Sequence, residues 1–307
     1  MEYSIRLLSA ASCTEEVHGK NRNMVYLFGT TKEGESIAVR TPLQMPYLQV
    51  VEPTKEAINE LENNEDVEGL EPLDLWVDGE IKNCTKITVS HPGRVPKIRE
   101  KLKNYGLKLL AADIPFHHRY LYDNDIGGCV RVRGKEIRKE GWSCKVIEVV
   151  EILPSESFES DFKILSFDIE NSIFERTIYC LSYCVKTSDG YIQEETLHGD
   201  EEKLLNDFVK AIKKYDPDII TGYNIDGYDL PLLVERAEVY GIELAIGRTG
   251  SKLDQKFQRF WQAQGRVIVD AWWNVKREIR PRQESLNAVA KELLGKEKHD
   301  VNPKEMD

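Results

Sequence analysis

Two acidic residues at the end of an apolar segment are the first in this sequence whose types and spacing suggest chemistry. Asp168 and Glu170 close the run Ile-Leu-Ser-Phe-Asp-Ile-Glu that begins at Ile164. On a β-strand, side chains two positions apart lie on one face, so both carboxylates would point the same way while Ile169 points into the core. Such a pair is costly unless it is neutralised, and a divalent cation with oxygen ligands does this. The tripeptide alone is weak evidence, because a chain with 53 acidic residues is expected to contain one by chance.

A second group of polar residues follows a short apolar segment further along the chain. Tyr223, Asn224 and Tyr228 lie in a loop, and Asp229 stands just before a helix that Pro231 helps to begin. Asp229 could simply cap this helix by accepting a backbone N–H, a contact worth about 1 kcal/mol. Capping does not explain why Asn224 and Tyr228 stand at fixed positions before Asp229 in the sequence. Metal binding and capping therefore both stay open for Asp229.

Alternating strands and helices must position these two groups. Apolar runs of strand length alternate with helical patterns, the strands at 162–169, 177–185, 219–220 and 265–270 and the helices at 202–215, 231–240 and 286–294. This alternation predicts an α/β layer with at least one parallel strand pair. Asp270 ends the last of these strands and could be mistaken for another metal ligand, but we assign it a structural role.

The first half of the chain has a different pattern, in which short alternating and short helical runs are mixed. It contains helical patterns at 54–61 and at 95–106, the second with Ile98, Leu102 and Tyr105 on one face. A polar, Pro- and Ser-bearing segment at 153–161 separates the two halves. We therefore predict a mixed α+β N-terminal domain over residues 1–155 and an α/β domain over residues 156–307.

Composition excludes several classes of protein. The chain has 307 residues, of which 41% are hydrophobic, so global disorder is excluded and about two domains are expected. It has no apolar run of ~18 residues and no apolar leader, which argues against a membrane span or a secretory signal. Its six scattered cysteines favour a reducing cytoplasm. The net charge of −11 leaves two readings, a local basic groove on an acidic body or carboxylates kept for metal ions.

Taken together, the two acidic groups resemble the exonuclease domain of family B DNA polymerases. Asp168-Ile169-Glu170 matches the first motif of that family, and the stretch from Asn224 to Asp229 matches the second, with Tyr228 where Phe is commoner. The phrase Asp-Pro-Asp-Ile-Ile at 216–220 is also typical of the family. The resemblance implies a ribonuclease H-like α/β fold for the second domain.

The chemistry that the resemblance implies is two-metal 3′→5′ hydrolysis of a terminal phosphodiester, used for proofreading in DNA replication. With two Mg²⁺ or Mn²⁺ ions, Asp168 would bridge both, Glu170 would bind one and orient the attacking water, and Asp229 would support the second. The residues expected to place the frayed strand, by stacking and hydrogen bonding, are Tyr223, Asn224 and Tyr228.

The third exonuclease motif of this family, Tyr-x-x-x-Asp, is missing. No tyrosine follows Tyr240, which has Leu244 four residues on, and His299 is followed five residues later by Lys304. The polymerase signature Tyr-Gly-Asp-Thr-Asp is absent as well. We therefore expect an N-terminal fragment of a longer polymerase, cut before this motif and inactive by itself.

The resemblance extends upstream and there is specific to archaeal family B polymerases. It rests on the segments 91–100, 113–116 and 119–121 and, more loosely, on 45–48. In those enzymes the corresponding residues form a shallow pocket that captures uracil in the template strand. The residues expected to form it here are Pro46, Tyr47, Val95, Ile114, Pro115 and Phe116. Such a pocket can exclude thymine, although one methyl group is worth only ~1–3 kcal/mol.

The alternative for this set is an ordinary hydrophobic core beside a solvated basic helix face. If the pocket does bind DNA, nearby cations would contact phosphates, and the candidates are Arg94, Lys97, Arg99, Lys101 and Lys103.

The partners implied are single-stranded and primer-template DNA, the remainder of the polymerase chain and a sliding clamp bound through that remainder, with no membrane. Two other functions stay open. One is a non-catalytic module that binds single-stranded DNA or uracil, and the other is an inactive polymerase paralogue.

Overall fold

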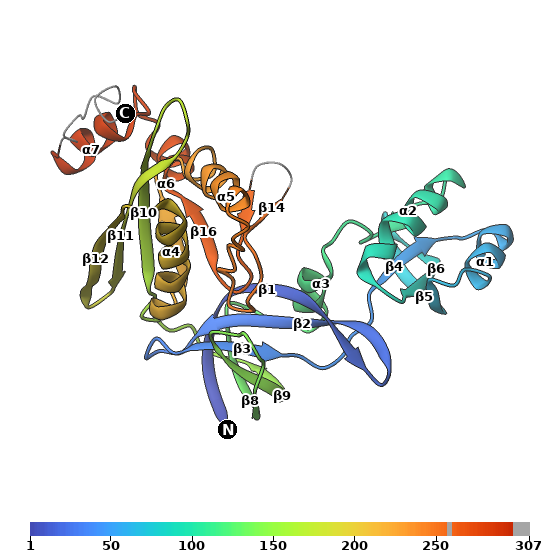
Figure 1. The fold of residues 1–307 in the computed structure, drawn as a ribbon. Coiled ribbons are helices and arrows are strands. Elements are labelled where there is room, and N and C mark those ends of the chain that lie inside the picture. Colours follow the sequence, from blue (N-terminus) through green and yellow to red (C-terminus); the bar gives the residue numbers. More distant parts are fainter. Residues whose placement is uncertain (257–259, 297–307) are drawn as a thin grey trace.

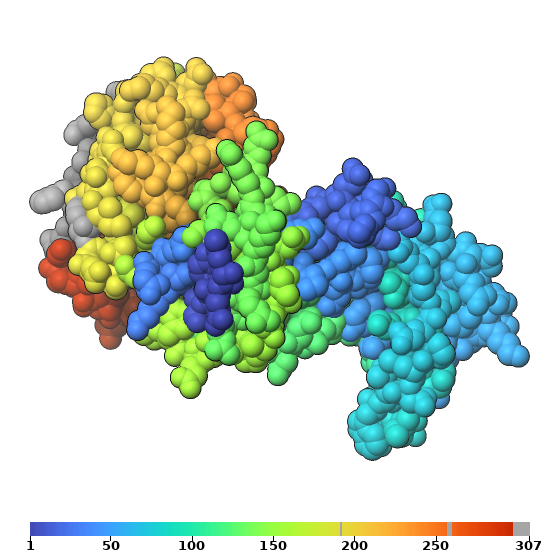
Figure 2. Space-filling view, turned by 90° about the horizontal axis from the view of Figure 1, so that it is seen from below, coloured from blue at the N-terminus to red at the C-terminus, as the bar shows by residue number. Residues whose placement is uncertain are grey.

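The computed structural model describes residues 1–256 and 260–296, which form three main β-sheets with helices packed on them (Figure 1). The N-terminal half contains a closed barrel and a separate four-stranded sheet, and the second half contains a five-stranded sheet. Figure 2 shows the four-stranded unit, coloured light blue to cyan, as a lobe that projects from the rest of the molecule. The predicted α/β class, with a mixed α+β first half, is confirmed.

The barrel has the strand order β1-β2-β3-β9-β8. Its strands are β1 (Glu2–Val17), β2 (Lys20–Thr30), β3 (Ser36–Arg40), β8 (Cys129–Ile137) and β9 (Lys145–Pro154). Helix α3 (Phe116–Asp123) closes its core, where Phe116 and Tyr120 pack against buried side chains such as Val25 and Ile147. The segment between β3 and β8 forms the projecting lobe, so the chain leaves the barrel and later returns to it.

The lobe is a four-stranded sheet of order β5-β6-β4-β7 with two helices. Its elements are β4 (Tyr47–Val51), α1 (Lys55–Glu62), β5 (Val67–Val77), β6 (Glu80–Val89), the 3₁₀ turn η1 (Pro92–Arg94), α2 (Val95–Asn104) and β7 (Leu109–Leu110). The predicted helices are present, and Ile98 and Leu102 are buried. Tyr105 was expected on the same buried face, which is wrong. The helix ends at Asn104, so Tyr105 is 44% exposed and its hydroxyl instead donates to Glu60 at 2.5 Å.

The second half is built on a sheet of order β12-β11-β10-β13-β16. Its strands are β10 (Ile164–Asn171), β11 (Ile178–Thr187), β12 (Gly190–His198), β13 (Ile219–Gly222) and β16 (Val267–Asp270), and β14 (Asp254–Lys256) with β15 (Phe260–Gln262) forms a separate ribbon. Its helices are α4 (Glu201–Tyr215), α5 (Asp229–Val239), α6 (Ala271–Asn274), the π-helical turn η2 (Val275–Ile279) and α7 (Leu286–Leu294). Strand β13 pairs in parallel with both β10 and β16, which confirms the predicted parallel pairing.

A buried polar cluster joins the barrel to this sheet. The guanidinium of Arg248, which is fully buried, donates to Ser36 of the barrel and to Asp218, both at 2.7 Å. Thr30, also in the barrel, donates its hydroxyl to Asp218 at 2.8 Å. Asp218 therefore links the barrel to the five-stranded sheet.

The segment between the two halves contains the predicted domain boundary. Strand β9 ends at Pro154 and β10 begins at Ile164, while the domain division after residue 155 remains a prediction. Residues 297–307 of the predicted second domain lie outside the described part of the chain. Within that part, the structure contains no helix with the length and apolar character needed to cross a bilayer. All six cysteines are free thiols.

Candidate nuclease site and template pocket

Strand β10 presents its acidic residues on the face opposite its core residues. Leu165, Phe167 and Ile169 are buried, whereas Asp168 is exposed and Glu170 half-buried. The apolar side chains pack into the core beneath helix α4, where Phe167 lies with its ring centroid 5.3 Å from that of Phe208. The alternation is the one that the sequence predicts for a strand with one buried face.

Strand β13 ends beside β10 because a glycine allows close approach. The two strands are parallel, with Leu165 paired to Ile220, so their carboxyl ends meet at one edge of the sheet. A Cβ atom on Gly222 would lie 2.6 Å from the carbonyl oxygen of Phe167 and would also collide with Ile225. Only glycine therefore lets the loop after β13 turn directly over the end of β10.

Asp270 holds that loop in shape. Its carboxylate, which is buried, accepts the backbone N–H groups of Asn224 at 2.8 Å, Asp226 at 3.0 Å and Trp272 at 2.9 Å. Asn224 has a φ of 63°, a left-handed conformation that needs such support in a residue other than glycine. These contacts give Asp270 the structural role that we expected.

The carboxylate of Asp229 lies close to β10, because both the charge of Asp168 and the backbone of Ile169 affect its pKa. Burial and, next, the negative charge of Asp168 raise the pKa of Asp229 to about 7, while the hydrogen bonds from backbone groups oppose this rise. The capping alternative is wrong in its simple form, because Tyr228 occupies the N-cap position and Asp229 is the first residue of α5.

One cleft of about 500 Å³ brings all the predicted nuclease residues together. It is lined by Asp168, Glu170, Tyr223, Asn224, Tyr228 and Asp229. The aromatic side chains are fixed at its wall, since the Tyr223 hydroxyl donates to the carbonyl of Glu284 at 2.5 Å and the Tyr228 hydroxyl donates to Asn171 at 2.9 Å.

Four further residues of this cleft were not predicted. They are Trp272, Glu284, Ser285 and Leu286. Ser285 caps helix α7 by accepting the N–H of Ala288, so the sequence signal for a helix beginning at this point was present. Nothing local in the sequence shows that this helix start lies against the end of β10, because only the tertiary fold brings the two together.

A second cavity, of about 350 Å³, lies between the lobe and the start of α3. All six residues predicted for a base pocket line it, namely Pro46, Tyr47, Val95, Ile114, Pro115 and Phe116. The Tyr47 hydroxyl is held by Asp123 at 2.9 Å, and the guanidinium of Arg119 lies 4.2 Å from the centre of the Tyr47 ring. The wall of the cavity is therefore an ordered network rather than a loose hydrophobic surface.

The basic residues predicted to contact phosphates are only partly available. Arg99 lines the cavity. Arg94 pairs with Asp66 at 3.3 Å, and Lys101 pairs with Glu60 at 3.0 Å. Two of the five candidate cations are thus paired with acidic residues of the same lobe.

Comparison with known proteins finds similarity to DNA polymerases. Residues 173–289 match the family model described as DNA polymerase family B, exonuclease domain. The chain is 44% identical over 172 residues to a DNA polymerase of Archaeoglobus fulgidus, which covers 53% of this chain and 21% of that protein. It is 29% identical over 250 residues to a DNA polymerase of Pyrococcus glycovorans, covering 75% of this chain and 27% of that protein.

Comparison of structures covers almost the whole chain. The family B DNA polymerase of the hyperthermophilic archaeon Pyrobaculum calidifontis superposes with a TM-score of 0.80 at 28% identity, over 96% of this chain and 40% of that one. The chain is thus similar to one part of archaeal family B DNA polymerases. It spans about a fifth to a quarter of the two polymerase sequences named above. The matched exonuclease segment of the polymerase family includes Asp229 and begins just after Asp168 and Glu170.

The cleft lined by Asp168, Glu170 and Asp229 suits a hard divalent cation in kind, since its donors are carboxylates. The described residues do not, however, include a group of three or more His, Cys, Asp or Glu side chains arranged to hold a metal ion. Mg²⁺ is often bound by one or two carboxylates and completed by phosphate oxygens and water. Asp168 and Asp229, close enough for one charge to raise the pKa of the other, fit a site of that kind.

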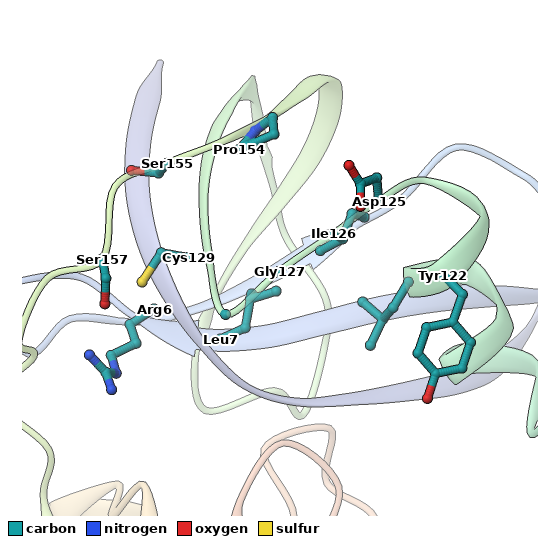
Figure 3. A pocket seen from close by; sticks show the side chains of 12 residues that line it. Arg6, Leu7, Tyr122, Asp125, Ile126, Gly127, Cys129, Pro154, Ser155 and Ser157 are labelled. Carbon is teal, nitrogen blue, oxygen red and sulfur yellow. The ribbon is translucent and has the colours of Figure 1, made fainter.

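A third cavity, of about 600 Å³, opens on the barrel where β1, the end of α3 and the segment after β9 meet. Figure 3 shows Arg6, Leu7, Ile126 and Pro154 among the side chains around it. The guanidinium of Arg6 donates to the carbonyl of Phe158 at 2.5 Å. None of the predicted site residues lies in this cavity.

Proposed function

We propose that this region is the proofreading 3′→5′ exonuclease of a DNA polymerase that acts in DNA replication, with primer-template and single-stranded DNA as its partners. The single observation that carries the proposal is the position of Asp229. The charge of Asp168 raises the pKa of the Asp229 carboxylate and both residues line one cleft, so acidic groups from two separate motifs meet there. Such a concentration of negative charge suits a cation and a phosphodiester better than an apolar ligand.

The residues that would hold Mg²⁺ or Mn²⁺ are Asp168, Glu170 and Asp229. Divalent ions in such a site supply a nucleophile from bound water and stabilise the leaving oxygen. Asp168, whose charge raises the pKa of Asp229, would serve both ion positions. Glu170 is half-buried at the end of β10. Its carboxylate would orient the attacking water by accepting a hydrogen bond from the water O–H.

The wall of the cleft would hold the end of the DNA strand. Tyr228 is 42% exposed although its hydroxyl is tied to Asn171, so its ring is available for stacking on a base. Tyr223 is anchored to Glu284 in the same way, and Asn224 is fixed through its backbone by Asp270. A wall whose side chains are already ordered loses little conformational entropy when it binds a strand.

The test is trimming of a 3′-labelled single-stranded oligonucleotide by the full-length polymerase with Mg²⁺ or Mn²⁺. Asp168→Ala should abolish trimming, because it removes the carboxylate shared by both ion positions. Asp189→Ala is the matched control, since Asp189 is exposed in the turn between β11 and β12 and should leave trimming unchanged. Normal trimming by Asp168→Ala would refute the nuclease assignment.

We propose a second function for the cavity at α3, the capture of uracil in the template strand. This proposal is supported by the six residues that the sequence predicted for the pocket. They come from three separate segments of the chain and line one cavity of about 350 Å³. A ring of pyrimidine size would lie between Pro46, Val95 and Pro115, with backbone groups reading its edge. The non-catalytic alternative, a module that only binds such DNA, differs in leaving the strand intact.

Binding of matched oligonucleotides with and without one deoxyuracil tests the pocket. We expect tighter binding of the uracil strand, and Val95→Gln should remove the preference by filling the cavity with a polar side chain. Val150→Gln is the control, because Val150 is 76% exposed on the barrel and does not line this cavity. Equal affinities for both oligonucleotides in the unaltered chain would exclude the pocket.

A further inference from the structure

The lobe is joined to the barrel by two stretches of chain, and the cavity proposed for uracil lies beside them. Residues 41–46 lead from β3 into β4, and residues 111–115 lead from β7 to α3 (Figure 1). Part of the cavity wall belongs to the lobe, with Val95 and Arg99 of α2, and part belongs to residues 114–116 at the start of α3, which packs on the barrel core. A change in the angle between lobe and barrel would therefore change the width of this cavity.

A tyrosine beside the cavity ties the lobe to α3. Tyr47 begins β4, and its hydroxyl donates to Asp123 at 2.9 Å and accepts the Nε–H of Arg119 at 2.9 Å. Tyr47 and Arg119 both line the cavity, so this tie is part of the pocket itself. It gives the lobe one point of attachment, about which the lobe could still turn.

An ion pair provides a second point of attachment. The guanidinium of Arg22, in β2, donates through Nη1 and Nη2 to the two carboxylate oxygens of Glu68, in β5, at 2.5 and 2.9 Å. Both side chains are largely buried, with 12% and 32% of their surface exposed. Such a two-point contact between a guanidinium and a carboxylate fixes orientation as well as distance. The pair thus holds an edge strand of the lobe sheet to the barrel.

The two attachment points lie at one end of the lobe sheet but on different strands. Thr88 of β6 pairs with Tyr47 on one side and with Gly69, the neighbour of Glu68, on the other. Neighbouring strands are about 4.8 Å apart, so Tyr47 and Glu68 are separated by roughly 10 Å across the sheet. Two points at this separation resist a rotation of the lobe, whereas either point alone allows it.

We propose that Arg22 and Glu68 are positioning residues, which hold the lobe at the angle at which the cavity fits a flipped base. They act through the lobe, because neither residue lines the cavity. Without the pair, a smaller fraction of the molecules has the binding-competent cavity, and the apparent affinity for a uracil-bearing strand falls with that fraction. This role rests on the proposed capture of uracil, which supplies the ligand for its test.

A charge-exchange cycle in the full-length polymerase tests this role. Arg22→Glu and Glu68→Arg each place like charges together, whereas the double variant restores an opposite pair with its partners exchanged. Binding of single-stranded oligonucleotides with and without one deoxyuracil is compared. We expect each single variant to weaken binding of the uracil strand about three- to tenfold and to leave the other strand unchanged, because only the fraction of competent cavity changes. The double variant should recover most of the preference.

The angle of the lobe is measured separately, without DNA. Spin labels at Ile81 on the lobe and Val150 on the barrel, which are 69% and 76% exposed, report the distance between the two units by pulsed electron paramagnetic resonance. Labelling through a ketone-bearing amino acid leaves the cysteines in place. We expect one narrow distance in the unaltered chain and in the double variant, and a broad or shifted distribution in each single variant. Arg133→Glu is the matched control, because it breaks an ion pair with Glu151, at 2.9 Å, inside the barrel, and it should change neither readout.

A narrow, unshifted distance in the single variants overturns the proposal, because the pair would then not set the angle of the lobe. A broad distribution with an unchanged preference for uracil overturns it as well, and so does a loss that the double variant leaves unrestored. If the unaltered polymerase binds both oligonucleotides equally, the proposed capture of uracil fails. That failure is recognised apart from the effect of the ion pair, since the distance measurement needs no DNA.

Discussion

Replacing Arg248 by methionine should destabilise the protein by about 3 kcal/mol. Arg248 is fully buried and donates to Asp218, which is also fully buried, and to Ser36 of the barrel. Removal of one partner of a buried ion pair typically costs about 3–5 kcal/mol, because the other charge remains buried without compensation. Asp218 keeps two donors, the Thr30 hydroxyl and the backbone N–H of Lys163, so the lower end of that range applies.

Denaturant unfolding followed by circular dichroism measures this loss. The double variant Arg248→Met with Asp218→Asn should be destabilised by clearly less than the sum of the single variants, since the unpaired charge is then absent. An Arg248→Met protein within about 1 kcal/mol of the unaltered chain would refute the reasoning, because the buried Asp218 charge would then not depend on its partner.

The same cluster predicts a dependence on pH. Arg248 and Arg266 lower the pKa of Asp216 against the opposing effect of burial. A carboxylate with a lowered folded-state pKa adds stability above its unfolded pKa of about 3.9, and this stability is lost as the pH falls through the folded value. The difference in stability between the unaltered chain and Arg248→Met should therefore shrink below about pH 4.

Three other predictions concern the nuclease site. Gly222→Ala should cost about 1–3 kcal/mol and impair trimming, because the new methyl group collides with the carbonyl of Phe167; denaturation and trimming of the same preparation check both effects. Burial and then the charge of Asp270 raise the pKa of Asp226 to about 6, so its negative charge destabilises the fold above that pH. Asp226→Asn should raise stability by about 1 kcal/mol at pH 7–8, after allowance for partial exposure, and by nothing at pH 4, as thermal unfolding at both values would show. Ser285→Ala should cost about 1 kcal/mol locally at the start of α7, and faster amide exchange in that helix would reveal it.

Local patterns were sufficient to predict the elements that carry the carboxylates. Strand β10 was predicted from a compact apolar run that ends in acidic residues, and α7 from a helical pattern closed by Gly295, because each signal lies within a few neighbouring residues. Strand β12 was missed, since its sequence Gly-Tyr-Ile-Gln-Glu-Glu-Thr-Leu-His is mostly polar and resembles a surface loop. It is a strand because β11 pairs with it along its length.

The sequence did not predict which polar side chains are buried by contacts with residues distant in the chain. Arg248 stands in the sequence Gly-Arg-Thr-Gly at 247–250, which is typical of a surface turn, yet its side chain is fully buried. Its burial depends on Ser36 and Asp218, which are distant in the chain and of types found everywhere on protein surfaces. The same reason explains why Glu284 and Trp272 were missed as cleft residues, since only the packing of α6 and α7 against β10 places them there.

The net charge of −11 left open whether this chain would offer DNA a basic groove or carboxylates for metal ions. The structure favours the second reading for the nuclease cleft, where the charge of Asp168 raises the pKa of Asp229. It weakens the first, because Arg94 and Lys101, two of the cations proposed for phosphate contacts, are paired with acidic residues. Neutralising fewer phosphates means releasing fewer counterions. The proposed DNA binding would then depend mainly on bound cations and on aromatic stacking in the cleft.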